Sequence, residues 1–188
     1  IGMRTLEHVW LAAAALLISA PIGLITGVLL SRPAARRVRG FVLFILGLGQ
    51  TIPSIALLAL AIGLIGVGAL PAILAIAVYA IIPIARGTTV GLLGVDYSVV
   101  DAARGAGMSS FQIIRAIELP LALPGIVGGL RLGGVGAVSA AALAYLIGAG
   151  GLGEFIFTGI SLLLPVAMLT GAIPAVVMAI TVDRMLDR

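Results

Sequence analysis

Long apolar runs alternate with short polar ones along this sequence, and five of the runs are long enough to cross a lipid bilayer. They cover about residues 8–31, 41–64, 69–92, 125–147 and 165–182. A helix of roughly 20 residues spans the hydrocarbon core and satisfies its own backbone hydrogen bonds there. The short alternating segments of a membrane barrel do not occur. The pattern therefore predicts an all-α membrane protein with five transmembrane helices, in which residues 1–188 form a single transmembrane domain.

Glycines at four-residue spacing mark two of the predicted spans. Gly23 and Gly27 lie in the first, and Gly125, Gly129 and Gly133 lie in the fourth. Small residues at this spacing let the backbones of membrane helices approach closely. We therefore expect a GxxxG packing face in the first span, and in the fourth a close helix crossing, either within one chain or across a dimer.

One polar segment, residues 95–124, interrupts the apolar pattern between the third and fourth spans. It holds five of the eighteen charged residues, which are Asp96, Asp101, Arg104, Arg115 and Glu118. Apolar residues at helical spacing predict a first short helix over 95–104. Because so little of the chain lies outside the lipid, this segment is where soluble partners are expected to bind.

A second short helix is predicted after a sharp break at Gly105 to Gly107. Ser109 or Ser110 can serve as its N-cap, and Ser109 with Gln112 three residues later fits a capping box. Pro120 lacks the N–H that would bond to the preceding turn, so the helix is expected to end there.

The distribution of arginine predicts the orientation of the chain. All eleven basic residues are arginine, and most lie in loops that five spans would place on one side. These are Arg32, Arg36, Arg37, Arg39, Arg104, Arg115, Arg184 and Arg188. The opposite side holds only Arg4. Since cytoplasmic loops carry the excess of basic residues, we expect an outside N-terminus, a cytoplasmic polar segment and a cytoplasmic C-terminus.

The composition excludes several classes of function. Apolar residues make up 62% and charged residues 10% of the chain, with no cysteine and one histidine. A thiolate or disulfide site is therefore excluded, and no metal site is expected. The chain has no lysine for a phosphate-binding loop, and the glycine pattern at 148–153 follows a span instead of a strand. We expect no enzymatic activity, no bound cofactor and no nucleic-acid partner.

The polar segment carries a recognisable motif, D-A-A-x-x-x-G followed after nine residues by I-x-L-P. Its residues are Asp101, Ala102, Ala103, Gly107, Ile117, Leu119 and Pro120. The motif resembles the EAA motif of the membrane permeases of ATP-binding-cassette (ABC) importers, with aspartate replacing the first glutamate. In sequence terms, the two alanines would keep one face thin, the glycine would permit a backbone reversal, and the proline would redirect the chain into the fourth span.

The resemblance extends over about residues 8–183. Segments 48–60, 79–88 and 146–160 are similar to the osmoprotectant branch of these permeases, which imports glycine betaine, choline, carnitine or proline betaine. It implies a multi-pass permease of a prokaryotic cell membrane, working by alternating access. The implied partners are cytoplasmic ATPase subunits that bind ATP and Mg, a second permease copy or paralogue, and an extracytoplasmic binding protein. The methionine-type permease shares the five-span plan and stays open as an alternative.

Several residues in the spans are candidates for the translocation path. Gln50, Thr51 and Pro53 interrupt the second span, and Tyr79 and Tyr145 could contact a quaternary ammonium group. Interhelical hydrogen bonds for the polar residues and packing for the tyrosines are the alternatives.

The Gly-rich segment after the fourth span is expected to be re-entrant or interfacial. Gly150, Gly151 and Glu154 are candidates there for an outer gate or a receptor contact, or they form a solvated loop. Arg86 and Arg131 are expected to extend to the cytoplasmic interface, or else to pair with Asp96 or Asp101.

Two other classes of protein fit the composition. A passive or ion-driven channel or secondary transporter would carry ionisable groups deep in its spans, and a structural assembly subunit would need no coupling segment. The deep positions offer mainly amides and hydroxyls.

Overall fold

A computed structural model describes residues 1–187, and all of the regular structure in that range is helical. Four helices are long and apolar enough to cross a membrane: α1 (Gly2–Ser31), α4 (Ala69–Leu93), α7 (Leu119–Leu143), which continues through short turns at both ends, and α9 (Pro165–Leu186). A bent pair of helices, α2 (Arg36–Gly49) and α3 (Ser54–Ile65), follows α1. If this pair counts as one span, the total rises to five. The predicted all-α class is confirmed.

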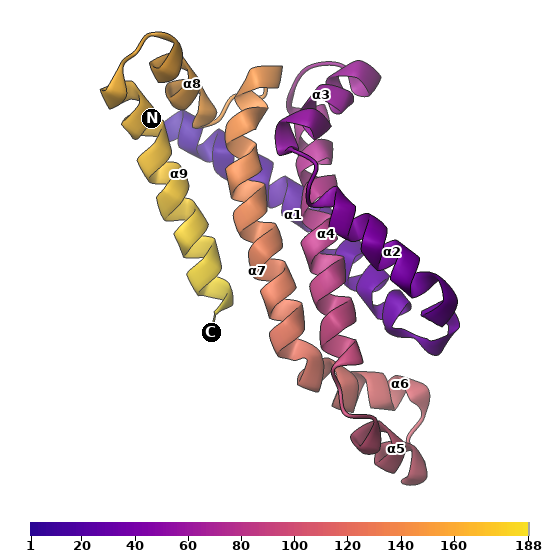
Figure 1. Cartoon of the computed structure of the whole chain (residues 1–188). Helices are drawn as coiled ribbons and strands as arrows, with labels where there is room; N and C mark the ends of the chain where they lie inside the picture. Colours follow the sequence, from indigo (N-terminus) through magenta and orange to yellow (C-terminus); the bar gives the residue numbers. More distant parts are fainter. Residues whose placement is uncertain (188) are drawn as a thin grey trace.

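The core lies where α1, α4 and α7 cross one another. Figure 1 shows α1 running obliquely across the other two, with α9 beside α7 at the edge of the bundle. The buried residues at the crossings are mostly small, among them Ala12, Ala15, Ala72, Ala80, Ala137 and Ala141. Between membrane helices, close packing of small residues replaces the hydrophobic driving force that water supplies to a soluble core.

The glycines confirm the predicted crossings and place them within one chain. A Cβ at Gly129 would lie 2.8 Å from the carbonyl oxygen of Pro83, and one at Gly125 would lie 2.6 Å from the Cα of Gly91. On α1, a Cβ at Gly23 would lie 2.7 Å from Cγ2 of Ile84. The backbones of α4 and α7 approach this closely only because neither carries a side chain there.

The second predicted span is not one straight helix. The axes of α2 and α3 meet at 94°, at the place where the sequence predicted an interruption. Thr51 ends the first helix in a turn, and Pro53 has extended backbone with ψ 131° immediately before α3. The residue before a proline avoids helical backbone, and a proline cannot bond to a preceding turn, so the chain changes direction here.

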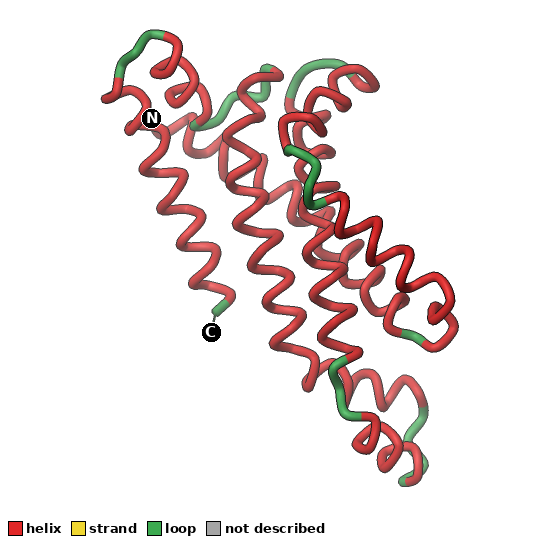
Figure 2. The backbone as a smooth tube through the Cα atoms, in the orientation of Figure 1, coloured by secondary structure: helices red, strands yellow, loops and turns green. Residues whose placement is uncertain are grey.

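The polar segment forms two short helices beyond the ends of α4 and α7. They are α5 (Tyr97–Gly105) and α6 (Ser110–Ile113), and a π-helical turn (Ile114–Glu118) leads from α6 directly into α7. We call residues 95–118 the elbow. It projects from one end of the bundle, where Figure 1 labels α5 and α6. Figure 2 shows the loops on either side of α5 in green.

The prediction that the helix ends at Pro120 is wrong. The N–H of Leu119 donates to the carbonyl oxygen of Ile114, five residues earlier, so the bonding pattern shifts by one residue next to the proline. Pro120 then occupies the second position of α7, where the missing N–H is tolerated. The direction of the chain still changes between α6 and α7, but through the π-turn and not through a helix end (Figure 1).

Two short elements close the opposite end of the bundle. A 3₁₀ turn (Ala144–Ile147) follows α7, and α8 (Gly153–Ser161) packs against α9. The turn into α9 contains Leu163, whose φ is +53°. A short helix between two membrane helices agrees with the predicted re-entrant or interfacial segment.

Candidate functional site

The reversal of the elbow is built around Gly107. Its φ is +81°, and its N–H donates to the carbonyl oxygen of Arg104 at 3.0 Å, while the N–H of Met108 donates to that of Ala103 at 3.2 Å. This pair of bonds is the Schellman motif, in which a glycine with left-handed backbone closes the end of a helix. The predicted break is confirmed, and Gly107 is the residue that makes it.

Side-chain caps hold both helices of the elbow at their starts. The N–H of Ser98 donates to the Asp96 carboxylate at 2.8 Å, and this bond lowers the pKa of Asp96 below its ordinary value. At α6, the N–H of Ser109 donates to the Gln112 amide oxygen at 2.8 Å, and the Ser109 hydroxyl accepts from the N–H of Gln112. The predicted capping box is therefore present, with Ser109 as the N-cap.

The motif residues divide between the tip and the root of the elbow. Asp101, Ala102 and Gly107 are exposed at the tip, whereas Ala103 is 9% exposed and faces inward. The two alanines therefore do not share one thin face, because adjacent helical residues point about 100° apart. Arg104 lies 3.8 Å from Asp101 and leaves the carboxylate exposed.

The remaining motif residues form the root. Ile117 lies in the π-turn, and Leu119 and Pro120 are the first two residues of α7. The motif thus places three exposed residues on a protruding reversal and three others where that reversal joins a membrane helix. A displacement of the tip would act on α7 through these root residues.

Near the break between α2 and α3, Arg86 lies close to Gln50. The Arg86 guanidinium donates to the Gln50 amide oxygen at 3.4 Å, beside a cavity of about 320 Å³ that also borders α7. The hydroxyl of Thr51 donates to the carbonyl oxygen of Leu48 at the end of α2, and Pro53 is exposed. The structure therefore places Gln50 next to Arg86, whose side chain was expected to extend to the cytoplasmic interface.

The alternative in which Arg86 and Arg131 pair with Asp96 or Asp101 is wrong. The Arg131 guanidinium donates to both carboxylate oxygens of Asp183 at 2.9 Å and also contacts Asp187, both on or just after α9. Neither Asp96 nor Asp101 takes part. The four-residue spacing of Asp183 and Asp187 puts both on one helix face, which is a signal for this pairing in the sequence. Arg188 lies outside the described residues.

The two tyrosines lie apart and pack against different helices. Tyr79 on α4 lies beneath Gly136 of α7, whose Cβ would come within 3.0 Å of the ring. Tyr145 stacks on Phe157 of α8 with ring centroids 6.2 Å apart. Both contacts fit the packing alternative, and neither tyrosine lines the cavity beside Gln50.

The candidates for an outer gate are tied to the first turn of α1. The Glu7 carboxylate accepts from the N–H of Gly151 at 2.9 Å, and Arg4 pairs with Glu7 at 2.8 Å and with Glu154 at 2.5 Å. Gly150 and Gly151 both have positive φ, at +77° and +87°. Sequence reasoning missed Arg4 and Glu7 as their partners, because more than 140 residues separate the two segments.

Nothing in residues 1–187 gathers into a metal site. His8 is fully buried, and its Nε2 lies 3.0 Å from the carbonyl oxygen of Val138. No group of three or more His, Asp or Glu residues lies close enough to hold an ion within the described part of the chain.

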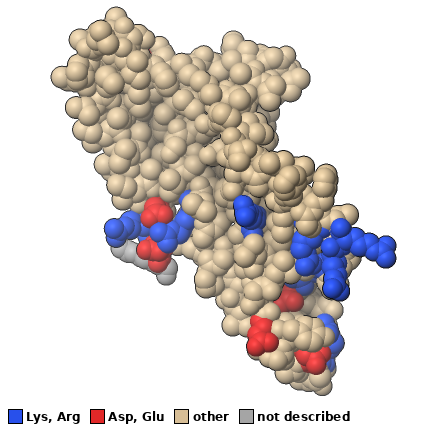
Figure 3. Space-filling model, in the orientation of Figure 1, with Lys and Arg blue, Asp and Glu red and all other residues tan. Residues whose placement is uncertain are grey.

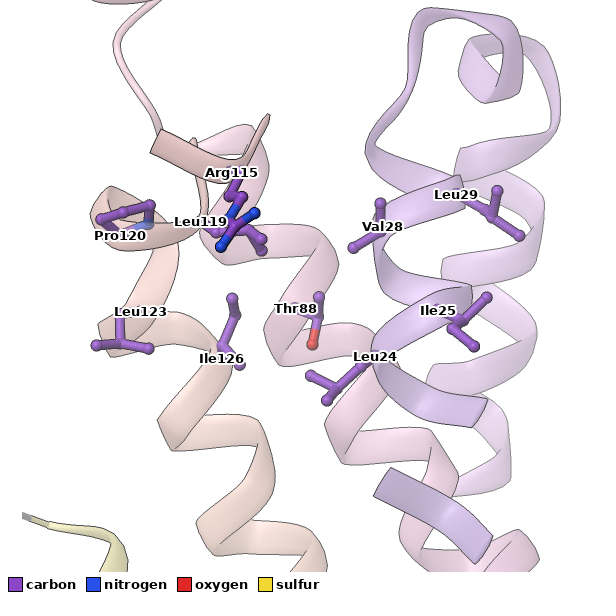
Figure 4. Close-up of a pocket in the computed structure, with 10 residues that line it drawn as sticks. All are labelled: Leu24, Ile25, Val28, Leu29, Thr88, Arg115, Leu119, Pro120, Leu123 and Ile126. Atoms are coloured by element: carbon purple, nitrogen blue, oxygen red, sulfur yellow. The ribbon is translucent and has the colours of Figure 1, made fainter. Parts of the chain in front are cut away.

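A wide groove of about 690 Å³ lies between α1, α4 and α7 near the elbow (Figure 4). Its walls are Leu24, Ile25, Val28, Leu29, Leu119, Pro120, Leu123 and Ile126. The two polar residues are Arg115 at one end and Thr88, whose hydroxyl is already bonded to Ile84. A small polar solute would find almost no hydrogen-bond partners in this groove.

Comparison with known proteins gives a consistent result. The family model described as "Binding-protein-dependent transport system inner membrane component" matches residues 5–188. A carnitine transport permease protein of Listeria monocytogenes is 40% identical over 186 residues, which cover 99% of this chain and 84% of the relative. A choline transport system permease protein of Bacillus subtilis is 37% identical over 183 residues, covering 97% and 83%. An osmoprotectant import permease protein of Salmonella typhimurium is 39% identical, covering 99% and 78%.

Among solved structures, an inward-facing conformation of the MetNI methionine ABC transporter contains a similar chain. The TM-score is 0.82 at 28% identity, covering 97% of this chain and 90% of that one. The likeness includes nearly all of the helical arrangement described above.

Proposed function

The chain belongs to the family of binding-protein-dependent transport system inner membrane components, and from this premise we propose that it is the permease subunit of an ABC importer for osmoprotectants. The solute class is a quaternary ammonium compound such as glycine betaine, choline or carnitine. The names of the relatives support this class, because carnitine, choline and osmoprotectant permeases match almost the whole chain.

The elbow is the observation that carries the proposal. It protrudes beyond α4 and α7, exposes Asp101, Ala102 and Gly107 at its tip, and continues into α7 without a helix end. A soluble partner can bind a protruding segment of this kind and displace it. In the proposed mechanism a cytoplasmic ATPase subunit binds the tip, and ATP and Mg are held by that subunit.

The exposed apolar faces support a second permease copy or paralogue. In α9 only Gly171 is buried, and exposed residues such as Val166, Ile173 and Val177 cover the helix. The bent pair α2 and α3 is also largely exposed. Lipid covers part of this surface, and a second permease completes the solute path next to the α2–α3 break, where Gln50 and Arg86 lie.

The proposed cycle is alternating access. ATP binding draws the two ATPase subunits and the elbows together, so that the spans open toward an extracytoplasmic binding protein that delivers the solute. ATP hydrolysis then returns the spans to the inward-open arrangement. Gly150, Gly151 and Glu154 lie at the opposite end from the elbow and form the outer gate or receptor contact in this proposal.

The orientation is part of the proposal. On the face that Figure 3 shows, charged side chains gather at one end of the molecule, over the elbow, the α1–α2 turn and the end of α9. Positive charge in excess favours the cytoplasmic side. The elbow therefore faces the cytoplasm, and the N-terminus faces outward in the cell membrane of a prokaryote.

A methionine-type amino-acid permease is the second candidate. The fold of the methionine transporter's permease supports it, at 28% identity. Uptake of radiolabelled carnitine, choline, glycine betaine and methionine, each with its own binding protein, decides between the two candidates.

The coupling role is tested at Gly107. Proline requires φ near −65°, whereas Gly107 has φ +81°, so Gly107→Pro cannot form the reversal. We expect ATP-driven uptake in proteoliposomes containing the ATPase and binding protein to be abolished, with membrane insertion unchanged. Gly105→Ala is the matched control, because Gly105 has open space around it and lies within α5. Normal uptake by Gly107→Pro would contradict the coupling role.

A further inference from the structure

One ion pair joins the elbow to α1. Nη1 of Arg32, the residue after α1, lies 2.7 Å from Oε2 of Glu118, the last residue of the π-turn. The two side chains are 26% and 14% exposed. Among residues 1–187, no other ion pair connects residues 95–118 to a different part of the chain. Glu118 occupies the variable position between Ile117 and Leu119 of the motif.

Arg32 is held in place from its own side. Its Nε donates to the carbonyl oxygen of Val28 at 3.2 Å and to the Ser31 hydroxyl at 3.0 Å. Arg39 donates to the carbonyl oxygens of Leu30, Ser31 and Arg32, at 2.7, 3.1 and 3.0 Å. These bonds satisfy the free carbonyls at the end of α1 and place a cation at its negative end. The Arg32 guanidinium is therefore anchored to α1.

Apart from an apolar cluster against which Val28 of α1 and Val95 of the elbow both pack, little else connects α1 to the elbow. The elbow packs mainly on itself and on α7, and a cavity of about 420 Å³ separates much of it from the ends of α1 and α4. Arg32 and Glu118 both line this cavity. The ion pair thus bridges the gap that this cavity leaves between α1 and the π-turn.

Glu118 lies at the end of the π-turn, so the ion pair can affect how easily this turn bends. A π-turn is a local irregularity at which a helix readily bends. A force on the tip of the elbow would therefore bend the chain at 114–118 unless that turn were braced. The partly buried pair is less screened by solvent than a surface pair, so it can supply the brace.

We propose that Arg32 and Glu118 are positioning residues that brace the π-turn, so that α1 and the elbow move as one body during transport. This role rests on the proposed function. Motion of the elbow then reaches both α7, through the chain, and α1, through the pair. Because α1 packs along α4, all three core helices take part in one movement.

Charge reversal tests the role in proteoliposomes that contain the permease, its ATPase and the binding protein. Arg32→Glu and Glu118→Arg should each lower the solute imported per ATP hydrolysed by about tenfold, the size expected for loss of a close pair. The double variant should recover most of the loss. Arg37→Glu is the control, because Arg37 is exposed and carries no ion pair within residues 1–187. A double variant as defective as the single ones would overturn the role.

A cross-link provides a stricter test, because the chain has no cysteine. The variant Arg32→Cys with Glu118→Cys should be uncoupled like the single reversals, and a short bifunctional thiol reagent should restore coupling. A monofunctional reagent of similar size should not. If the cross-link arrests uptake, the two sites separate during the cycle and the proposal fails.

Two further outcomes separate the possible failures. If the variants lower the unfolding temperature but leave solute imported per ATP unchanged, the pair is merely structural and the positioning role is overturned. If the unaltered chain shows no ATP-driven uptake with its partners, the proposed function fails and this role fails with it.

Discussion

At the scale of single residues, the spacing of α4 and α7 depends on glycines that face each other. Gly128 and Gly129 are neighbours on α7, yet they have different surroundings. A Cβ at Gly129 would lie 2.8 Å from the carbonyl oxygen of Pro83 and 3.2 Å from the Cα atoms of Ile84 and Gly87, all backbone atoms. A Cβ at Gly128 would meet nothing within 4 Å. Substitutions at these two glycines therefore separate the effect of close packing, present only at Gly129, from the effect of replacing a helical glycine, present at both.

We expect Gly129→Ala to destabilise the fold by about 1–3 kcal/mol, because backbone atoms cannot rotate away and the helices must move apart. Gly128→Ala should be neutral or slightly stabilising, since alanine favours a helix by up to about 1 kcal/mol over glycine. Thermal unfolding of both variants in detergent measures the difference. Equal unfolding temperatures would show that the backbones of α4 and α7 are not in contact.

At the scale of elements, α5 is stable only if its ends are closed, because a helix of nine residues is marginal by itself. The Asp96 cap closes one end and the reversal at Gly107 closes the other. The elbow can then protrude into water as a defined shape, which is what a partner protein needs to recognise.

The Asp96 cap predicts a pH dependence. Its pKa is lowered in the folded protein by the bond from Ser98, so its contribution is present above the ordinary pKa of about 3.9 and is lost as pH falls through the lowered value. An asparagine at this position would cap equally well without a charge. Amide hydrogen exchange over residues 97–105, corrected for intrinsic rates, should show lost protection in Asp96→Ala at pH 7 and normal protection in Asp96→Asn. As the pH falls below about 3.9, only the unaltered chain should progressively lose protection relative to its pH 7 value. Equal behaviour of the two variants would exclude the cap.

At the scale of the whole molecule, the elbow and the α3–α4 turn lie at opposite ends (Figure 1). Ser110→Cys and Val67→Cys place single thiols at exposed positions at these two ends of a cysteine-free chain. In intact cells, a membrane-impermeant maleimide should label Val67→Cys directly. It should label Ser110→Cys only after the cells are opened, because the proposed orientation places the elbow in the cytoplasm. The reverse pattern would place the elbow outside and remove it from any ATPase.

Sequence alone determined the apolar spans, the polar elbow with its capping box, and the motif, because each depends on residues close together in the chain. It also located the break at Gln50 to Pro53, since proline acts on its immediate neighbours. An apolar segment in lipid must satisfy its own backbone hydrogen bonds, so it forms a helix however the helices pack.

Only the tertiary structure decided which distant residues meet. Arg32 with Glu118, Arg131 with Asp183, and Glu7 with Gly151 are separated by 52 to 144 residues. Such pairs follow from where helices cross, and that depends on the matching of small residues on several helices at once. The wrong expectation at Pro120 has a different, local cause, because the π-turn at 114–118 lets the helix continue past the proline. The chain can therefore be assigned to a class from its sequence, whereas the contacts between its distant segments follow from its packing.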